Sequence, residues 1–338
     1  MIKRKPDFNN FLKVLQREVP DRPVLFELFL NGPLYERLAG RTAPKWNTAE
    51  EILFLADAFA AAGYDYTSVS GSGFGFKRAD HERKKTISLN DDGGIKDRRS
   101  FQEYPWPDPE EANYSKLEKA APHLPEGMKL MVMGPSGVLE NVIALVGYDN
   151  LCYMLFDDPD LVQDIFDAVG QRLLRYYELT LRYDAVGVVM SNDDWGFNTQ
   201  TFLSTEDMRK YVYPWHKKIV EAGHKANRPV ILHSCGNFDV AMEDVIETLK
   251  YDAKHSYEDV ILPVEDAYER WGHRIAILGG LDVDFMIRST PAEIQKRALA
   301  MLERTRERGG YALGTGNSVP EYIPQEQYFA MTDTVDLF

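Results

Sequence analysis

The chain has 338 residues, of which 44% are hydrophobic and 27% are charged, and its formal net charge is −14. This is the composition of a soluble globular protein with enough apolar residues for a large core. The acidic balance, together with the lack of any stripe rich in Lys and Arg, argues against binding to nucleic acid or to an anionic membrane surface.

Short apolar runs alternate with amphipathic segments along most of the chain. We expect strands at residues 24–28, 66–70, 130–133, 186–190, 230–232, 253–256, 274–278 and 311–313. We expect helices at residues 7–18, 48–63, 138–183 with a break near 157–159, 205–226, 239–249 and 291–308, and a final helix near the C-terminus. Eight strand candidates alternating with helices predict an α/β fold, a single-domain (β/α)8 TIM barrel with an N-terminal helical extension. An open doubly wound sheet is the alternative, although no glycine-rich dinucleotide motif follows the first strand.

Residues 71–112 interrupt this alternation. They are polar and rich in Gly and Pro, and residues 90–94 are typical of a β-hairpin turn. Because the segment has too few apolar residues for a core of its own, we interpret it as an insertion in the barrel domain. Three roles stay open for it, namely a lid, a contact in a homodimer, and a docking surface for a partner protein.

The cysteine content and the N-terminus bear on the cellular compartment. Cys152 and Cys235 are too few for a disulfide framework, so free thiols are expected. No apolar run approaches the length of a membrane span, and the basic N-terminal residues are not followed by the apolar part of a signal peptide. A cytoplasmic location is therefore expected.

Polar residues follow most of the strand candidates. In a barrel, the carboxyl ends of all strands meet on one face, where active sites lie. His233 and Cys235 follow the run at 230–232, and imidazole and thiolate are ligands that zinc favours. The other polar residues expected on this face are Glu27, Ser70 or Ser72, Ser136, Asp193, Asp194, His255, Tyr257, Asp282, Thr315 and Asn317. Together they predict the rim of an active site.

Each of these residues also has a structural interpretation. A His-x-Cys pair alone is a weak metal signal, because a free cysteine is often a small buried apolar residue. Asp193 and Asp194 can cap a turn, and Asp282 can cap a helix. His255 can be a core histidine, and Glu27 can belong to a salt bridge. The remaining histidines are expected at the surface; they are His81, His123, His216, His224 and His273.

Four of the motifs resemble the uroporphyrinogen decarboxylase superfamily, and within it the branch of cobalamin-dependent methyltransferases. The motifs are SNDDWG at 191–196, LHSCG at 232–236, GGLD at 279–282 and GTG at 314–316. The resemblance covers roughly residues 10–335, and the His-x-Cys-Gly element is its most specific part. It implies a (β/α)8 barrel, in agreement with the strand count.

The resemblance to the methyltransferases implies a zinc site made by His233, Cys235 and a second cysteine at the position of Thr315. Because Thr is a poor zinc ligand, we expect Glu27 to complete the site, with Asp194 as the second choice. The implied reaction moves a methyl group between a corrinoid carried by a partner protein and a small molecule. The expected catalytic residues are Glu27, Asp193, Asp194, His255, Tyr257 and Asn317. The residues expected to bind the cofactor are Ser136 and Asp282.

Two other functions stay open. The true decarboxylase carries arginines in its N-terminal segment, an aspartate after the second strand and a histidine in the last Gly-x-Gly. Here residues 26–31 contain Glu27 and no arginine, residues 68–72 contain no acid, and Thr315 stands in the Gly-x-Gly. A methyltransferase is therefore favoured over a decarboxylase of uroporphyrinogen. The third reading is a non-catalytic barrel that binds a small ligand, which the lack of a second cysteine supports.

Overall fold

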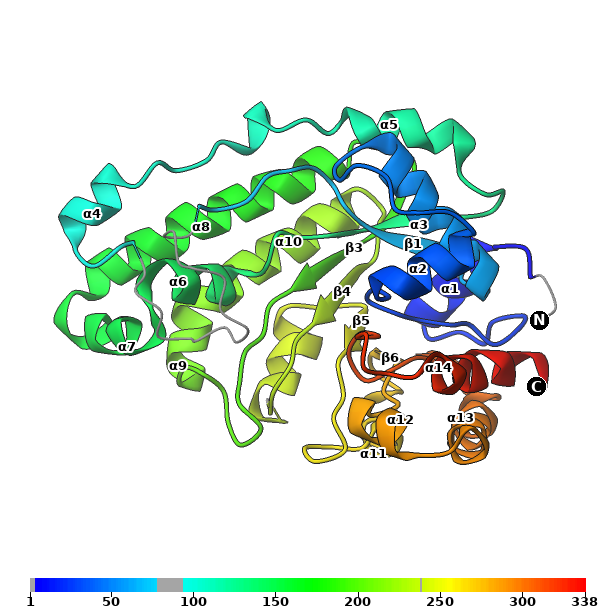
Figure 1. Ribbon diagram of the computed structural model, residues 1–338. Helices are drawn as coiled ribbons and strands as arrows, with labels where there is room; N and C mark the ends of the chain where they lie inside the picture. The colour runs from blue at the N-terminus through cyan, green and yellow to red at the C-terminus, as the bar shows by residue number, and fades with distance from the viewer. Residues whose placement is uncertain (1–3, 78–93, 238) are drawn as a thin grey trace.

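The computed structural model describes residues 4–77, 94–237 and 239–338, and its centre is a curled sheet of seven parallel strands in sequential order (Figure 1). The strands are β1 (Tyr66–Ser70), β2 (Lys129–Met133), β3 (Val186–Asn192), β4 (Val230–His233), β5 (Ala253–His255), β6 (Ala276–Leu278) and β7 (Tyr311–Ala312). The helices are α1 (Phe8–Leu15), α2 (Gly32–Ala39), α3 (Ala49–Ala62), α4 (Arg98–Glu103), α5 (Ser115–Ala120), α6 (Val138–Val146), α7 (Tyr148–Asp157), α8 (Pro159–Thr180), α9 (Thr205–Asp207), α10 (Tyr213–Lys225), α11 (Val264–Trp271), α12 (Val283–Arg288), α13 (Pro291–Thr305) and α14 (Gln325–Thr332). The alternation of strands and helices confirms the α/β class predicted from the sequence.

The first expected strand, at residues 24–28, is a single bridge rather than a strand. Leu25 pairs with Leu313 in parallel, and the Leu313 N–H donates to the Val24 carbonyl at 2.8 Å. On the other side, the Tyr66 hydroxyl donates to the Glu27 carbonyl at 2.6 Å and accepts from the Glu27 N–H at 2.7 Å. The segment thus lies between β7 and β1. In the described part of the chain the regular sheet has seven strands, and a closed barrel of eight is not confirmed.

Three expected helices differ from the structure. Residues 205–226 form the short α9, a π-helical turn (Met208–Val212) and α10 instead of one α-helix. Residues 239–249 form a 3₁₀ turn (Asp239–Ala241) and a π-helical turn (Asp244–Thr248) instead of one α-helix. The long helical region 138–183 breaks near Asp158 as expected, where the Asp158 carboxylate caps α8 by accepting from the Leu161 N–H at 3.0 Å. It also breaks at Gly147, whose φ of +86° is a conformation that glycine adopts without strain.

The described part of the insertion packs against helix α8. Trp106 makes edge contacts with Phe76, Phe101 and Tyr104, with ring centroids 4.7 to 6.3 Å apart. The Arg172 guanidinium of α8 lies 4.8 Å from the Trp106 ring centroid. The hairpin turn predicted at 90–94 lies outside the described residues, apart from Gly94.

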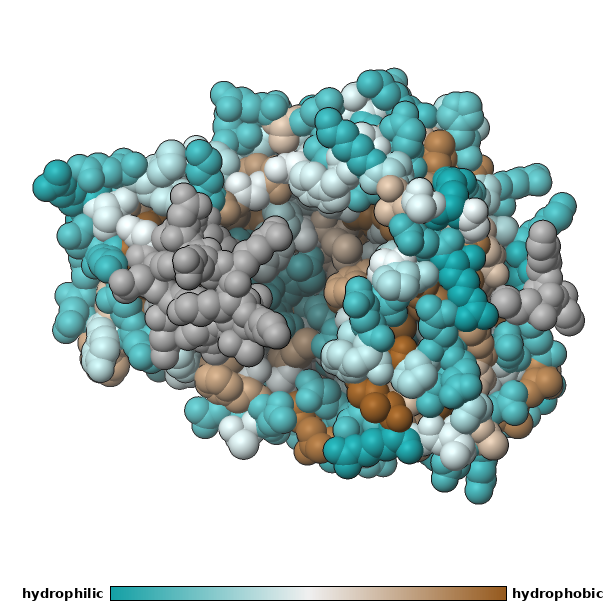
Figure 2. Space-filling view, in the orientation of Figure 1, coloured by the Kyte–Doolittle hydropathy of each residue, from teal (hydrophilic) through white to brown (hydrophobic). Residues whose placement is uncertain are grey.

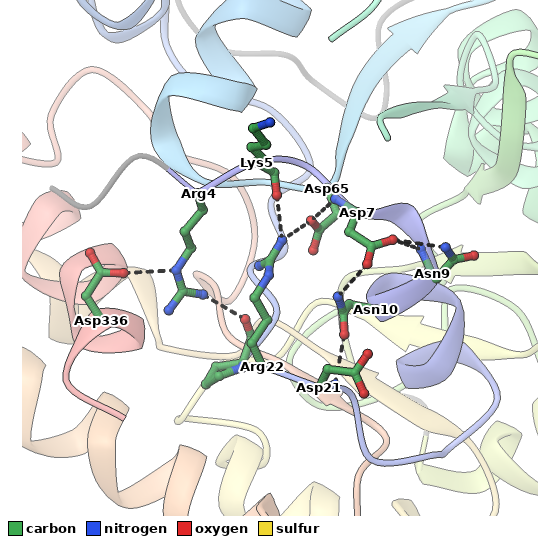
Figure 3. Close-up of polar contacts among 10 residues, drawn as sticks. Arg4, Lys5, Asp7, Asn9, Asn10, Asp21, Arg22, Asp65 and Asp336 are labelled. Atoms are coloured by element: carbon green, nitrogen blue, oxygen red, sulfur yellow. Dashed lines mark hydrogen bonds and ion pairs between the residues drawn. The ribbon is translucent and has the colours of Figure 1, made fainter. Parts of the chain in front are cut away.

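The N-terminal and C-terminal segments lie side by side (Figures 1 and 3). The Arg4 guanidinium forms an ion pair with Asp336 at 2.9 Å and donates to the Pro23 carbonyl at 3.0 Å. Next to it, Arg22 forms an ion pair with the buried Asp65, so three distant parts of the chain are joined at the amino end of the sheet. Within the described residues, every helix is too short or too polar to cross a bilayer.

Candidate active site at the ends of three strands

The expected site residues gather where β3, β4 and β5 end. His233 is the last residue of β4, and in the sheet register it lies between Asn192 of β3 and His255 of β5. Figure 2 shows a hollow with a hydrophilic floor in the region of β3 and β4. His233 and His255 are nevertheless buried, so the sheet places two imidazoles side by side below the surface.

The two imidazoles form a chain of hydrogen bonds that fixes their tautomers. Burial lowers the pKa of His233 to about 4 and that of His255 well below its usual value, so both rings are neutral near pH 7. His255 Nε2 lies 3.3 Å from the Thr315 carbonyl, which can only accept, so this nitrogen carries the proton. His255 Nδ1 then accepts from His233 Nδ1 at 2.9 Å. His233 Nε2 is left with a free lone pair.

Cys235 lies close to that lone pair. Its Sγ is 3.8 Å from His233 Nε2, 3.3 Å from the Ser256 hydroxyl and 3.2 Å from Asn317 Nδ2, which donates to it. The Cys235 N–H donates to Asp194 Oδ1 at 2.8 Å. Burial and the nearby Asp194 carboxylate raise the pKa of the thiol to about 12. The protein alone therefore keeps a thiol here, and a cation is needed to make the thiolate the stable form.

A close approach of two glycines joins the loops that carry Asp194 and Cys235. Gly236 has a φ of +97°, and a Cβ at this position would lie 2.2 Å from the Gly196 carbonyl oxygen. Only glycine fits both the conformation and the space. The loop after β3 and the loop after β4 are thereby held against each other.

Asp194, His233 and Cys235 are a candidate metal site. One ligand atom from each lies within 4.8 Å of the others, and His233 Nε2 is 3.9 Å from Asp194 Oδ1. A tetrahedral zinc ion would need separations of about 3.4–3.6 Å between such atoms, so small side-chain shifts suffice. His233 donates through Nδ1 to His255 and keeps the lone pair of Nε2 for a metal ion. Metal-bound histidines commonly use their two nitrogens in this way. The three residues fit a zinc ion with an open fourth position.

Glu27, the expected third ligand, has its carboxylate elsewhere. Its Oε1 accepts from the Thr315 N–H and its Oε2 from the Thr315 hydroxyl, both at 2.8 Å. The side chain is fully buried, and this burial raises the pKa of Glu27 to about 8. Among the described residues, the cluster with metal-ligand geometry contains Asp194 and not Glu27.

Asp193 points away from its neighbour Asp194. Its carboxylate accepts from the N–H groups of Leu139 and Glu140 at 3.0 and 2.9 Å, which caps the first turn of α6. It also contacts His216 Nε2 at 2.8 Å. His216 was predicted to lie at the surface, and this prediction is wrong, since the side chain is completely buried. Its place in the apolar stripe of α10, four residues before Val220, was the signal for burial.

The comparisons with known proteins agree with this architecture. The family model described as uroporphyrinogen decarboxylase (URO-D) matches residues 114–338, which is two thirds of the chain. The chain belongs to the URO-D family. The family resemblance predicted from the motifs is thereby confirmed.

Curated URO-D proteins resemble the chain at low identity. Uroporphyrinogen decarboxylases from Anaeromyxobacter sp. (strain Fw109-5) and Citrobacter koseri are 24% and 25% identical over 193 and 186 residues, covering 57% and 54% of this chain. These matches span about half the length of the relatives, 52% and 50%. A solved structure of a methyltransferase from Methanosarcina mazei has a TM-score of 0.71 at 16% identity, over 97% of this chain and 98% of that one. At this identity the likeness shows the fold alone, and it is a TIM-barrel-like fold.

The remaining expected residues of this URO-D family member lie around the same loops. Asp282 caps α12 by accepting from the Phe285 N–H at 2.9 Å, and its other oxygen accepts from the Asp259 N–H at 2.9 Å. Tyr257 is buried, and its hydroxyl has no partner among the described residues. An open groove of about 850 Å³ is lined by Tyr257, Asp282 and Asn317, and Asn317 also donates a hydrogen bond to the sulfur of Cys235.

Sequence reasoning missed two ionisable residues of the site. Lys254 of β5 is 3% exposed and donates to the Ser256 carbonyl, and burial lowers the pKa of its amine to about 7. Glu140 accepts from the Gly137 N–H at 3.2 Å, and its carboxylate contacts the Ser136 hydroxyl. Burial, with Asp193 and Asp194 nearby, raises the pKa of Glu140 to about 8. A lysine inside a buried strand was a readable signal, whereas Glu140 looks like an ordinary N-terminal helix acid.

Proposed function

We propose that the chain is a methyltransferase in which Asp194, His233 and Cys235 hold a zinc ion. The observation that carries this proposal is the convergence of one oxygen, one nitrogen and one sulfur ligand atom within 4.8 Å at the strand ends. Three protein ligands with an open fourth position are typical of catalytic rather than structural zinc sites. A bound zinc ion would supply Lewis acidity that lowers the pKa of a substrate thiol or other acidic group.

The protein residues around the three ligands have complementary roles in this proposal. His255 and the Thr315 carbonyl keep the lone pair of His233 Nε2 available. Asn317 and Ser256 place hydrogen-bond donors on the Cys235 sulfur and so stabilise its thiolate form. The side chain of Asp194 is 37% exposed, so a substrate could reach a metal held here from the solvent side.

Proton transfer is assigned to the buried carboxyl group of Glu140. With a pKa of about 8, this group holds its proton near pH 7. In the direction that takes the methyl group from the small molecule, Glu140 would give this proton to the heteroatom that the methyl group leaves. The methyl group would move between a small molecule and a corrinoid carried by a partner protein. The metal-ligand set and the acidic surroundings support this reaction over decarboxylation of a polyanionic tetrapyrrole.

The test is the metal content of the purified protein, measured for the wild type and for Cys235→Ser. We expect about one zinc per chain in the wild type and its loss in the variant, because Ser is a poor zinc ligand. Cys152→Ser is the matched control, since Cys152 lies on α7 and should leave the metal content unchanged. Zinc retained in Cys235→Ser, or no metal in the wild type, would contradict the proposal.

A second assay separates the two enzyme classes. Purified protein is incubated with methylcobalamin and candidate thiols, and in parallel with uroporphyrinogen. Methyl transfer that is lost in Cys235→Ser supports the proposal. Turnover of uroporphyrinogen that survives the same substitution would assign the protein to the decarboxylases.

A further inference from the structure

A second chain of buried polar groups lies directly behind the candidate metal site. Asp193, His216 and Tyr251 belong to the loop after β3, to α10 and to the segment before β5. Asp193 and His216 are completely buried, and Tyr251 is 4% exposed. Polar groups so deep in a core are retained only with full hydrogen bonding, and each of these has it.

The His216 ring joins the other two residues through both of its nitrogens. His216 Nε2 donates to Asp193 Oδ2 at 2.8 Å, and the Tyr251 hydroxyl is hydrogen-bonded to His216 Nδ1 at 2.6 Å. The Ser191 hydroxyl lies 3.3 Å from the same Nδ1. The imidazole also packs edge-on against Trp195, with ring centroids 5.0 Å apart. These contacts hold the His216 ring in one orientation.

Asp193 transmits this order to the proposed metal ligands. Its backbone N–H donates to the carbonyl of His233 at 2.9 Å, so it is bonded directly to one ligand residue. It is also the chain neighbour of a second ligand, Asp194. Its carboxylate caps α6, and Gly137 leaves the room for it, because a Cβ at residue 137 would lie 2.0 Å from the Asp193 Cβ.

We propose that His216 is a positioning residue that holds Asp193 and thereby sets the geometry of the Asp194, His233 and Cys235 site. This inference rests on the proposed metal function. His216 is buried in α10 and is not itself a ligand. In this proposal it nevertheless controls the affinity and the geometry with which the site binds a metal ion. Partners one shell behind metal ligands commonly act in this way.

The test measures binding of Co²⁺ alone to the full-length metal-free protein, by its visible absorption, in the wild type and in His216→Phe. Phe fills a similar space but can make neither hydrogen bond. We expect Co²⁺ affinity to fall by about tenfold to a hundredfold and the absorption bands to shift. His216→Gln, which keeps an N–H to offer Asp193, should recover part of the loss.

The chain offers a matched control on the same helix. His224 of α10 also contacts an aspartate, Asp252, at 2.8 Å, but it is exposed and lies near the far end of α10. His224→Phe should therefore leave Co²⁺ affinity and spectrum unchanged. Circular dichroism establishes that each variant is folded. If His216→Phe does not fold, Tyr251→Phe, which removes one hydroxyl, takes its place and should also weaken Co²⁺ binding.

The outcomes separate this inference from the proposed function. In the first outcome, the wild type binds Co²⁺ and the folded His216→Phe variant binds it with the same affinity and spectrum. This result would overturn the positioning role and leave the metal site intact. The same holds for unchanged binding by Tyr251→Phe. Wild type that binds no Co²⁺ would overturn the metal site itself, and the positioning role with it.

Discussion

Replacement of Glu27 by Gln tests how the centre of the fold tolerates a buried acid. Both oxygens of Glu27 accept hydrogen bonds from Thr315, one from its N–H and one from its hydroxyl. Gln is nearly isosteric, and its amide oxygen can keep the first of these bonds. The Thr hydroxyl can turn to accept from the new NH₂ group, so Glu27→Gln should preserve the local geometry.

The magnitude follows from the pKa of Glu27. Burial raises this pKa from its ordinary value of 4.5 to about 8, so between these pH values the native protein holds a proton that the unfolded chain has lost. The stabilising effect of that protonation is complete below pH 4.5, and it is lost as the pH rises through 8. The loss is about 1.4 kcal/mol per pH unit, which amounts to about 5 kcal/mol over the interval.

Urea unfolding of the wild type and of Glu27→Gln, measured at pH values from 4.5 to 9, checks this reasoning. The stability of the variant relative to the wild type should rise with pH across the interval and level off above pH 8. A difference that does not change with pH would refute the assignment of a protonated Glu27. Since the Glu27 oxygens bond to Thr315, the variant should bind the proposed zinc ion as the wild type does. Loss of zinc from the variant alone would instead make Glu27 a ligand.

Three further predictions follow from single contacts. Nitrogen NMR of the metal-free protein should show His233 as the neutral tautomer protonated at Nδ1 down to about pH 4, whereas a proton on Nε2 would contradict the hydrogen-bond chain. Gly137→Ala should destabilise the protein by about 1–3 kcal/mol or more in thermal unfolding, because the new Cβ overlaps Asp193. Gly32→Ala, with no atom within 4 Å of the new Cβ, should be neutral or stabilising, and equal losses in the two variants would contradict the argument. The pKa of Lys254 is about 7 in the folded protein and 10.5 in the unfolded chain. The stability of the wild type relative to Lys254→Met, measured by urea unfolding, should therefore rise by about 1.4 kcal/mol per pH unit from pH 7 to 10.5. A difference in stability that does not change with pH would rule out a neutral amine.

The elements that the sequence predicts well are those with a strong local signal. The run at 230–232 is apolar and short, and it forms the buried core of β4 with His233 at its end. Helix α3 begins after Thr48 and ends before Gly63, as the cap residues indicate. The segment 24–28 has an equally apolar sequence but makes only a bridge. Its pairing depends on where β7 and β1 lie, which no local pattern contains.

Within the site, the sequence could predict the residue types but not their directions. Asp193 and Asp194 are adjacent, and nothing in their sequence shows that one caps α6 while the other faces Cys235. The apolar stripe of α10 indicates that His216 is buried, but its contact with the Asp193 carboxylate depends on the packing of α10 against β3 and β4, which is a tertiary property. Chain neighbours can thus have separate functions because the end of a strand exposes them to different surroundings.

Thr315 shows how one residue can lose a ligand role and gain a supporting one. The resemblance to the methyltransferases places a second cysteine ligand at this position. Here the Thr315 carbonyl accepts from His255, which directs the His233 lone pair toward the metal site, while its N–H and hydroxyl hold Glu27. A thiolate committed to a metal could not donate a hydrogen bond to Glu27. Thr315 therefore fits the proposed site in which Asp194 supplies the third ligand, and its hydrogen bonds link the protonated Glu27 to the tautomer of His233, the proposed metal ligand.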